Sequence, residues 1–454
     1  MIRSGSTPIP DTPLGKHRMS REYRMPSSRL ARLAKMGRLA GGLASGVVSE
    51  GARQLAKGNR PRLDQLLLTP ANARRLGDRL SEMRGAAMKL GQLISMDSGN
   101  VLPPELSEAL ARLRDKAHYM PLGQVAQVLE NAWGKDWDRD FARFIFTPLA
   151  AASIGQVHDA QLRDGPRVAI KVQYPGVRQS IDSDVDNMAT LLRLTHALPP
   201  EFDLTPLLAE AKRQLHDEAD YLLEAGHIAR YAEHLGDDPR YELPLTLPER
   251  TTAEVLCMHF LDGQPIETLA ALPRTQRTQL ATDLLELALR EVFVWGVVQT
   301  DPNFANYRFN PANGRLQLLD FGATRVYTPP FRDALRTLLL SAIDGSEDDL
   351  ARAAAQVGYF TEDDPLRYRQ AFVKVLGIAA EPARRDVPFV FAGSDLPRRM
   401  RDALIQLRFH DRFSRIPPAD ILYLHRKISG MYLLMARLEV ALPLRKIARE
   451  TVSA

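Results

Sequence analysis

The stretch "TDPNFANYRFNPANGRLQLLDFG", from Thr300 to Gly322, combines a hairpin pattern with oxygen-bearing side chains at fixed spacings. The segment "NYRFNPANGRLQLLDFG" contains an Asn-Gly pair, which is a strong hairpin signal. Asn306 follows Asp301 by five residues, and Asp320 follows Asn306 by fourteen. Carboxylate and amide oxygens are the ligands that Mg²⁺ prefers. The stretch therefore predicts a hairpin that carries candidate ligands for a hard cation.

Further upstream, the chain supplies the other parts that phosphoryl transfer from a nucleotide requires. This reaction needs a loop over the phosphates, a lysine on them, metal-binding oxygens and a carboxylate beside the acceptor. "VAIK" ends a strand pattern at Lys171, a point charge for the α- and β-phosphates if an acid holds it. Asp301 and Asn306 have the spacing of a kinase catalytic loop. Each motif alone has a plainer interpretation, such as a solvated lysine, but their joint order favours nucleotide chemistry.

Acidic residues downstream of Lys171 are candidates for holding that lysine. "DEADYLLEAGH" places Glu218, Asp220 and Glu224 on a predicted helix. Asp220 and Glu224 share a face of that helix, and Glu218 lies about 120° around it from Glu224. Two differently aimed acids can hold two different cations, although solvated surface acids remain an alternative.

The predicted phosphate loop, "AAASIGQV", departs from the glycine-rich pattern G-x-G-x-x-G-x-V. Ala150 and Ala152 stand at the first two glycine positions, and Gly155 stands at the third. A Cβ removes free access to positive φ and crowds the approach of backbone to phosphate. We therefore expect a stiffer loop with a different phosphate geometry.

Other departures concern the acceptor side of the site. Gln299 and Thr300 replace the usual His-Arg pair, and Asn303 stands where protein kinases keep a lysine. No "APE"-like segment follows Asp320. The sequence therefore gives little support to phosphorylation of peptide substrates.

Periodicity predicts an α+β protein with two lobes. We expect a flexible basic arm over 1–28, a helical extension over 29–147, an N-lobe with inserted helices over 148–263 and a helical C-lobe over 264–454. Within the extension, one apolar stripe predicts a helix over 76–94, from whose opposite side Lys89 and Gln92 project. A solvated helix face is the plain interpretation of these two residues.

Composition adds constraints on partners and compartment. The net charge is only +5, yet basic residues crowd the first forty positions, which favours an anionic partner such as acidic lipid or nucleic acid. We find neither a secretory signal nor an apolar run of the roughly eighteen residues that cross a bilayer. An organellar transit peptide stays open for a eukaryotic source. The single cysteine, Cys257, excludes an internal disulfide framework and is expected to be a buried, inert thiol.

Several motifs together resemble one family, the UbiB-type or aarF-domain-containing atypical kinases. They are "KLGQ" at 89–92, "AAAS" at 150–153 and "EAD" at 218–220, with "QTDPNFAN" and "LLDFGATR" typical of its coenzyme Q branch. The likeness runs from about residue 30 to the C-terminus. It implies an ATP-binding, protein-kinase-like fold whose N-terminal helical extension lies over the usual substrate cleft.

The resemblance also assigns roles to residues. It implies that Lys171 pairs with Glu224 and contacts phosphates, while Asp301 occupies the catalytic aspartate position. The Mg²⁺ ligands would be Asn306 and Asp320. Nucleotide contacts would come from Ala150, Ala151, Ala152, Ser153 and, through the backbone at the adenine hinge, His259. A regulatory group near the site would comprise Lys89, Gln92, Glu218 and Asp220.

The favoured function is an ATPase or small-molecule kinase that uses ATP/ADP with Mg²⁺ and supports ubiquinone biosynthesis at a membrane surface. The expected partners are an anionic membrane, bound peripherally, and quinone precursor lipids or ubiquinone-biosynthetic proteins. We expect the cytoplasmic face of the inner membrane in a bacterium, or the matrix side of a mitochondrion. A nucleotide-sensing scaffold and a Ser/Thr protein kinase are the alternatives, and no nucleic-acid partner is expected.

Overall fold

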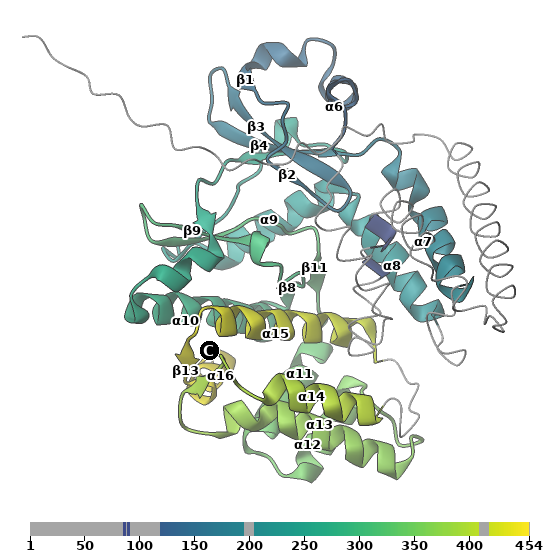
Figure 1. Ribbon diagram of the computed structural model, residues 1–454, viewed down its shortest axis with the longest axis vertical. Helices are drawn as coiled ribbons and strands as arrows, with labels where there is room; N and C mark the ends of the chain where they lie inside the picture. Colours follow the sequence, from purple (N-terminus) through teal and green to yellow (C-terminus); the bar gives the residue numbers. More distant parts are fainter. Residues whose placement is uncertain (1–84, 88, 91–118, 195–203, 408–416, 454) are drawn as a thin grey trace, which may run out of the picture.

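The computed structural model describes residues 85–87, 89–90, 119–194, 204–407 and 417–453. Figure 1 shows these residues in two lobes, with a small sheet in the upper lobe and a mainly helical lower lobe. The structure therefore has the predicted α+β class and the bilobal, kinase-like arrangement. The predicted arm over 1–28 and most of the helix over 76–94 lie outside the described residues.

The upper lobe is built on an antiparallel five-stranded sheet. Its strands are β1 (Phe141–Phe144), β2 (Ala150–Ala151), β3 (Gly155–Leu162), β4 (Arg167–Gln173) and β6 (Val255–His259). The order is β1-β3-β4-β6, with β2 paired to β3. β3 and β4 form a hairpin around "RDG", in which Lys171 lies opposite Val157. Val168, Ile170 and Val172 are buried on one face of β4. Because successive side chains of a strand point to opposite faces, the Lys171 side chain lies on the other face of the sheet.

The first part of this lobe corrects the predicted extent of the helical extension. Helix α6 (Leu122–Trp133) is followed by the short helix η1 (Trp137–Asp140) and then by strand β1. Val125 and Leu129 of α6 pack in one cluster with Val168 and Cys257 of the sheet. The aromatic run in "FARFIF" favours a strand, and β1 pairs with β3, so the helical extension does not reach residue 147.

Three helices connect β4 to the rest of the lobe. They are α7 (Val177–Leu194), α8 (Thr205–Glu218) and α9 (Tyr221–Leu235). The prediction that Glu218, Asp220 and Glu224 share one helix is wrong, because α8 ends at Glu218 and Asp220 is the N-cap of α9. The Asp220 carboxylate accepts the N–H of Leu222 at 3.1 Å, a bond that makes aspartate favourable at a helix start.

A second sheet lies beneath the first and carries the predicted Asn-Gly hairpin. β9 (Tyr307–Asn310) and β10 (Arg315–Leu318) pair antiparallel, which confirms that prediction. Gly314 in the turn has φ +75°, a conformation that favours glycine. The flanking strands are β5 (Tyr241–Glu242) and β7 (Gln264–Pro265), in the order β5-β10-β9-β7. A separate pair, β8 (Val297–Gln299) and β11 (Thr324–Val326), brackets the hairpin.

The remaining elements form the helical lower lobe. The longer helices are α10 (Arg274–Arg290), α11 (Pro329–Asp344), α12 (Glu347–Val357), α13 (Leu366–Arg384), α14 (Leu396–Ile405), α15 (Ala419–Arg437) and α16 (Leu444–Ser453). The short elements are η2 (Pro248–Arg250), η3 (Ile266–Ala271), η4 (Glu291–Trp295), η5 (Phe304–Asn306), β12 (Phe389–Val390) and β13 (Ala441–Leu442). In Figure 1, α15 runs across the middle of the molecule below β8 and β11.

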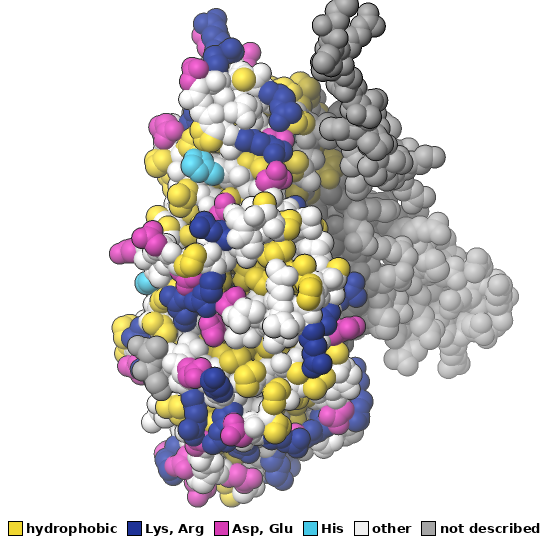
Figure 2. All heavy atoms as spheres, turned by 90° about the vertical axis from the view of Figure 1, so that its left-hand side faces the viewer, with side chains coloured by type: hydrophobic (Ala, Val, Ile, Leu, Met, Phe, Trp, Pro, Cys, Tyr) yellow, Lys and Arg dark blue, Asp and Glu magenta, His cyan; other side chains and the backbone are white. Residues whose placement is uncertain are grey.

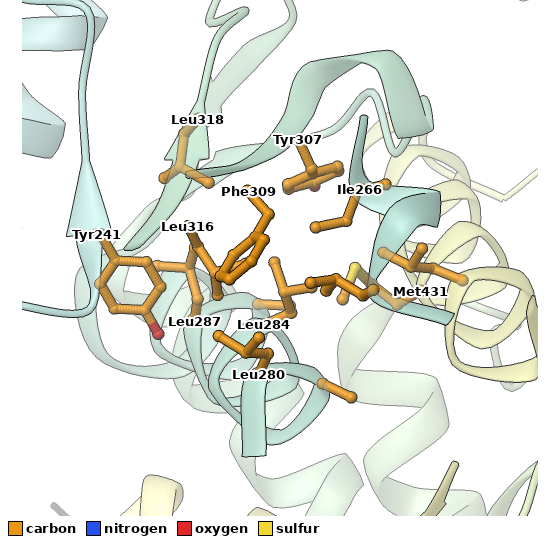
Figure 3. Packing of buried hydrophobic residues seen from close by; sticks show 14 of the residues in the cluster. Tyr241, Ile266, Leu280, Leu284, Leu287, Tyr307, Phe309, Leu316, Leu318 and Met431 are labelled. Atoms are coloured by element: carbon orange, nitrogen blue, oxygen red, sulfur yellow. The ribbon is translucent and has the colours of Figure 1, made fainter. Parts of the chain in front are cut away.

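The lower core explains why α15 lies so close to the hairpin. Figure 3 shows Met431 of α15 in the same buried cluster as Leu284 and Leu287 of α10 and Phe309 and Leu316 of the hairpin. Helix α15 is thus packed directly against the strands that follow Asn306. α11 begins seven residues after Gly322, so the chain enters a helix without an extended activation segment.

Two further sequence predictions bear on the fold. Cys257 is fully buried in the upper sheet, and burial raises the pKa of its thiol to about 12, as an inert thiol requires. Among the helices of the described ranges, none combines the length and the apolar character that a membrane span needs.

Candidate functional site

Lys171 lies at the centre of a cluster of acids between the two lobes. Its Nζ donates to both carboxylate oxygens of Glu224, at 2.8 and 2.9 Å, and lies 3.4 Å from Oδ2 of Asp320. The lysine is 7% exposed and Glu224 only 2%, so the solvated-lysine interpretation is wrong. The Asp320 side chain is 39% exposed and lies at the open side of this cluster. The ammonium group is therefore fixed beside a carboxylate that solvent, or a ligand, can reach.

The charges of these three groups depend on one another. Burial alone would lower the pKa of Lys171, but the carboxylates of Asp320 and Glu224 outweigh it and raise that pKa. Burial raises the pKa of Glu224 to about 6, against the opposing effect of Lys171. Burial also works against ionisation of Asp320, yet Lys171 and the N–H of Gly322 lower the pKa of Asp320. At neutral pH the site holds an ammonium between two carboxylates, and the exposed one is the stronger acid.

The catalytic-loop residues predicted from spacing come together at the end of β8. Nδ2 of Asn306 donates to the carbonyl of Asp301 at 3.0 Å and lies 3.4 Å from its carboxylate. The carbonyl of Asn306 accepts the N–H of Leu319 at 3.0 Å, one residue before Asp320. The hairpin thereby brings the two predicted metal ligands to the outer ends of two paired strands, Asn306 just before β9 and Asp320 just after β10, although fourteen residues separate them in sequence.

Gln299 and Thr300, which depart from the usual kinase pair, tie this loop together. Nε2 of Gln299 donates to the carbonyls of both Asp301, at 2.8 Å, and Asp320, at 3.2 Å. The Thr300 hydroxyl donates to the carbonyl of Ala323 at 2.7 Å. Gln299 and Thr300 thus fix the backbone before the hairpin, at Asp301, and after it, at Asp320 and Ala323. Sequence reasoning missed this role because neither residue matches the His-Arg pair of the kinase catalytic loop.

The oxygen donors fit a Mg²⁺ ion. Because Nδ2 of Asn306 is used on Asp301, its amide oxygen is left for another partner, and Oδ1 of Asp320 accepts the N–H of Gly322 at 3.0 Å. No cluster of three His, Cys, Asp or Glu side chains that could hold a metal occurs within the described ranges. A cation held by only two protein oxygens takes its other ligands from phosphate and water, the usual arrangement for Mg²⁺.

The alanine-rich loop forms a closed hairpin. Ala150 pairs with Val157 and Ala151 with Gln156, and the N–H of Ala152 donates to the carbonyl of Gly155 at 2.8 Å. A Cβ on Gly155 would lie 2.5 Å from the carbonyl oxygen of Val172, so only glycine permits this close packing. The N–H of Ala152 is therefore bonded within the loop, and the expected stiffness stays a prediction.

The predicted regulatory residues are only partly brought together. Lys89 forms an ion pair with Glu218, and the Ser153 hydroxyl donates to the same carboxylate at 3.0 Å. Lys89 is 6% exposed, so its interpretation as a solvated residue is wrong. Asp220 instead caps α9 and lies 3.5 Å from Arg178. Gln92 lies outside the described residues.

The predicted hinge residue, His259, is the exposed end of β6. Its N–H donates to the carbonyl of Leu245 at 2.9 Å, and the N–H of Phe260 donates to Arg167 at 3.0 Å. Both N–H groups are therefore bonded within the protein. Contact of this segment with adenine stays a prediction.

Arg426 is a residue of the site that sequence reasoning missed. It lies on α15, and its guanidinium forms an ion pair with the Asp301 carboxylate. The two residues are 125 positions apart, and no motif spacing connects them. Only packing of α15 against the catalytic loop brings them into contact.

The fold and the lysine–acid cluster define a kinase-like phosphotransferase. The chain belongs to the ABC1 atypical kinase family, since the ABC1 atypical kinase-like domain matches residues 112–354. It is 36% identical over 428 residues to "Atypical kinase COQ8, mitochondrial" of Saccharomyces cerevisiae, covering 94% of this chain and 85% of the relative. "Atypical kinase COQ8B, mitochondrial" of Rattus norvegicus is 36% identical over 434 residues, with 95% and 82% covered.

A solved structure shows the same architecture. The complex of Rv3197 with erythromycin from Mycobacterium tuberculosis aligns with a TM-score of 0.56 and 26% identity, over 84% of this chain and 96% of that one. The resemblance predicted from the motifs is thus confirmed. The protein is an atypical kinase-like, ATP-binding enzyme of the phosphotransferase class, in a family that serves coenzyme Q biosynthesis.

Proposed function

We propose that the protein binds ATP or ADP with Mg²⁺ at this cluster and hydrolyses ATP, or phosphorylates a small molecule, in support of ubiquinone biosynthesis. The observation that carries the proposal is Lys171, held by Glu224 and facing Asp320. In this assignment Lys171 binds the phosphates and Asp301 faces the acceptor, while Asn306 and Asp320 hold the cation. Ala150, Ala151, Ala152 and Ser153 cover the phosphates, and the segment at His259 lies beside adenine.

The short path from Asp320 to α11 supports a small acceptor. β11 begins two residues after Gly322 and pairs with β8, so the chain that would form a peptide-docking segment is part of a two-stranded ribbon. Water or a small hydroxyl compound needs no such platform. A protein acceptor is therefore the less favoured choice.

The membrane partner is proposed from the basic N-terminal arm, which lies outside the described residues. On the face shown in Figure 2, Lys and Arg side chains are interspersed with those of Asp and Glu. A mixed surface of this kind gives no strong attraction to one sign of charge. Because basic residues crowd the N-terminal part of the sequence, we assign to the arm the attraction to anionic lipids, at the inner membrane or the matrix side of a mitochondrion.

The test is ATP hydrolysis by the purified full chain with Mg²⁺, with and without anionic liposomes that contain a phenolic quinone precursor. We expect Mg²⁺-dependent hydrolysis, stimulated by the liposomes and lost in Asp320→Asn. Asp395→Asn, a surface aspartate with a 58% exposed side chain, is the matched control and should behave as the wild type. Absence of hydrolysis by the wild type under all these conditions would refute the proposal.

The internal hydrogen bond of Ala152 favours one alternative, a nucleotide-sensing scaffold that organises biosynthetic enzymes without turnover. The two functions differ in a deletion strain. If Asp320→Asn restores quinone in lipid profiles as well as the wild type does, the scaffold is favoured. Loss of quinone favours turnover.

A further inference from the structure

Arg426 brings a positive charge to the catalytic-loop aspartate from the far end of the chain. Its Nη2 contacts Oδ1 of Asp301. The side chains are 13% and 27% exposed, respectively, so the pair is largely shielded from water. A guanidinium is always charged near neutral pH, which makes this a permanent cation beside the acceptor position.

The catalytic loop has no cation of its own. Asn303 occupies the position where protein kinases keep a lysine, and the residues from Asp301 to Asn306 contain no Lys or Arg. The Asn303 side chain accepts the N–H of Ala305 at 3.1 Å and thereby caps η5. Charge that develops on a transferred phosphoryl group must therefore be balanced from elsewhere.

Helix α15 holds Arg426 in a fixed position. The next residue, Lys427, is buried and lies 2.7 Å from the carboxylate of Glu291. One turn further, Gly430 packs against Pro302, where an added Cβ would lie 2.2 Å from the proline ring. Arg426 and Gly430 share one face of the helix, so both contact the same loop. A group held in this way needs little reorganisation during a reaction.

The guanidinium also retains an unused donor. Nη1 of Arg426 is buried and has no hydrogen-bond partner among the described residues. A buried, unpaired donor of a charged group is costly. Because Nη1 is buried, we expect the guanidinium to act on a phosphoryl group beside Asp301 through its charge.

We propose that Arg426 supplies, from α15, the positive charge that the catalytic loop lacks, with Nη2 on Asp301 and the guanidinium charge acting on the transferred phosphoryl group. This inference rests on the proposed function. In the step it serves, the bond between the γ-phosphorus and the bridging oxygen breaks and its electron pair leaves with ADP. An acceptor oxygen, that of water in hydrolysis, forms the new bond to phosphorus, and the proton of the acceptor passes to Asp301.

The first test compares Arg426→Gln with the wild type in ATP hydrolysis and in nucleotide binding. We expect kcat to fall by about 10²-fold, while KM for MgATP stays within about threefold, because the charge acts on the transferred group. Affinity for MgADP with aluminium fluoride, a mimic of the transferred phosphoryl group, should fall in parallel with kcat. Affinity for MgADP alone should not change.

The second test returns the charge to the loop. In the Arg426→Gln background, Asn303→Lys should recover at least about tenfold of the lost kcat, because it returns a cation to the loop at the position where protein kinases keep a lysine. Asn303→Ala in the same background removes the cap without adding charge and should recover nothing. Arg325→Gln is the structural control, because Arg325 also anchors α15, through Asp420, without contacting Asp301. Arg325→Gln should lower Tm and leave unchanged the ratio of the affinity for MgADP with aluminium fluoride to the affinity for MgADP alone.

Three outcomes would overturn the inference. These are an unchanged kcat in Arg426→Gln, equal losses of affinity for MgADP with and without aluminium fluoride, or no difference between the Asn303→Lys and Asn303→Ala double variants. Failure of the wild type to hydrolyse ATP would count against the proposed function instead. The fluoride complex would then still test Arg426, because its formation needs no turnover.

Discussion

At the scale of single residues, the site depends on charges that are held out of water. Glu224 is 2% exposed and its pKa is raised to about 6, so it is the group of the cluster that takes up a proton first as the pH falls toward neutrality and below. Lys171 stays protonated and Asp320 stays ionised through that range, because each lies beside an opposite charge. The state of Glu224 therefore decides whether Lys171 is held by a charged partner.

This arrangement predicts a pH dependence. As the pH falls through about 6, Glu224 becomes neutral, its pairing with Lys171 weakens, and ATP hydrolysis at saturating MgATP should fall. Glu224→Gln should be less active throughout and should lack this acidic limb. The comparison cancels titration of the nucleotide itself. An identical acidic limb in both proteins would contradict the assignment to Glu224.

The alanine-rich loop gives a second prediction at this scale. Ala152→Gly should loosen the turn that the Ala152–Gly155 hydrogen bond closes, and it should change the ratio of ATP to ADP affinity. The flexibility of glycine is worth about 0.5–1 kcal/mol, which corresponds to roughly two- to fivefold in affinity. Thermal-shift titrations with both nucleotides measure the ratio. Unchanged affinities would show that loop stiffness does not control nucleotide choice.

At the scale of elements, α15 acts on the catalytic loop through close packing. The approach of Gly430 to Pro302 leaves no space for a methyl group. The same helix carries Arg426 to Asp301 and Met431 into the lower core. Its register thus determines the geometry of the loop, although α15 contributes none of the motifs found in the sequence.

Gly430→Ala tests this packing. The added Cβ must displace Pro302 or the helix, so we expect a loss of about 1–3 kcal/mol in the free energy of unfolding together with reduced turnover. Gly377→Ala, in α13, is the control, because no atom lies within 4 Å of its added Cβ. It should raise stability by about 0.5–1 kcal/mol and leave turnover unchanged. Equal effects of both substitutions on turnover would exclude a specific role for the α15 contact.

At the scale of the whole molecule, the N-terminal extension is coupled to the nucleotide loop through one carboxylate. Glu218, at the end of α8, binds Lys89 of the extension and Ser153 of the loop. A movement of the extension therefore reaches the predicted phosphate loop without an intervening element. The carboxylate joins three segments that are distant in sequence.

Lys89→Ala should weaken this coupling. Without its cation, Glu218 is no longer held between the two segments, and we expect faster exchange of bound nucleotide because the Ser153 loop is less restrained. Stopped-flow release of a fluorescent ADP analogue measures the rate. Lys212→Ala, whose ammonium makes an ion pair with Asp186 on the same group of helices, is the control. Equal release from wild type and Lys89→Ala would exclude the coupling.

The sequence predicted the parts of the site that are local. The "VAIK" strand, the Asn-Gly hairpin and the Asp301–Asn306 spacing depend on periodicity and turn chemistry over short distances, and the structure has each of these elements. The prediction of a single helix through Glu218 and Glu224 is wrong, because Asp220 caps the start of a new helix, α9, within a segment whose periodicity is helical throughout. The predicted helical extension is too long at its C-terminal end, because the segment from Phe141 pairs with β3 as a strand despite its apparently helical periodicity.

By itself, the sequence determined the family, the order of the chemical groups and the replacement of glycines by alanines in the loop. Only the tertiary structure decided where the N–H of Ala152 donates, how Gln299 ties the loop together, and that Arg426 contacts Asp301. The physical reason is distance along the chain. Motifs record interactions between neighbours, whereas a contact across 125 residues depends on the packing of whole helices against a shared core.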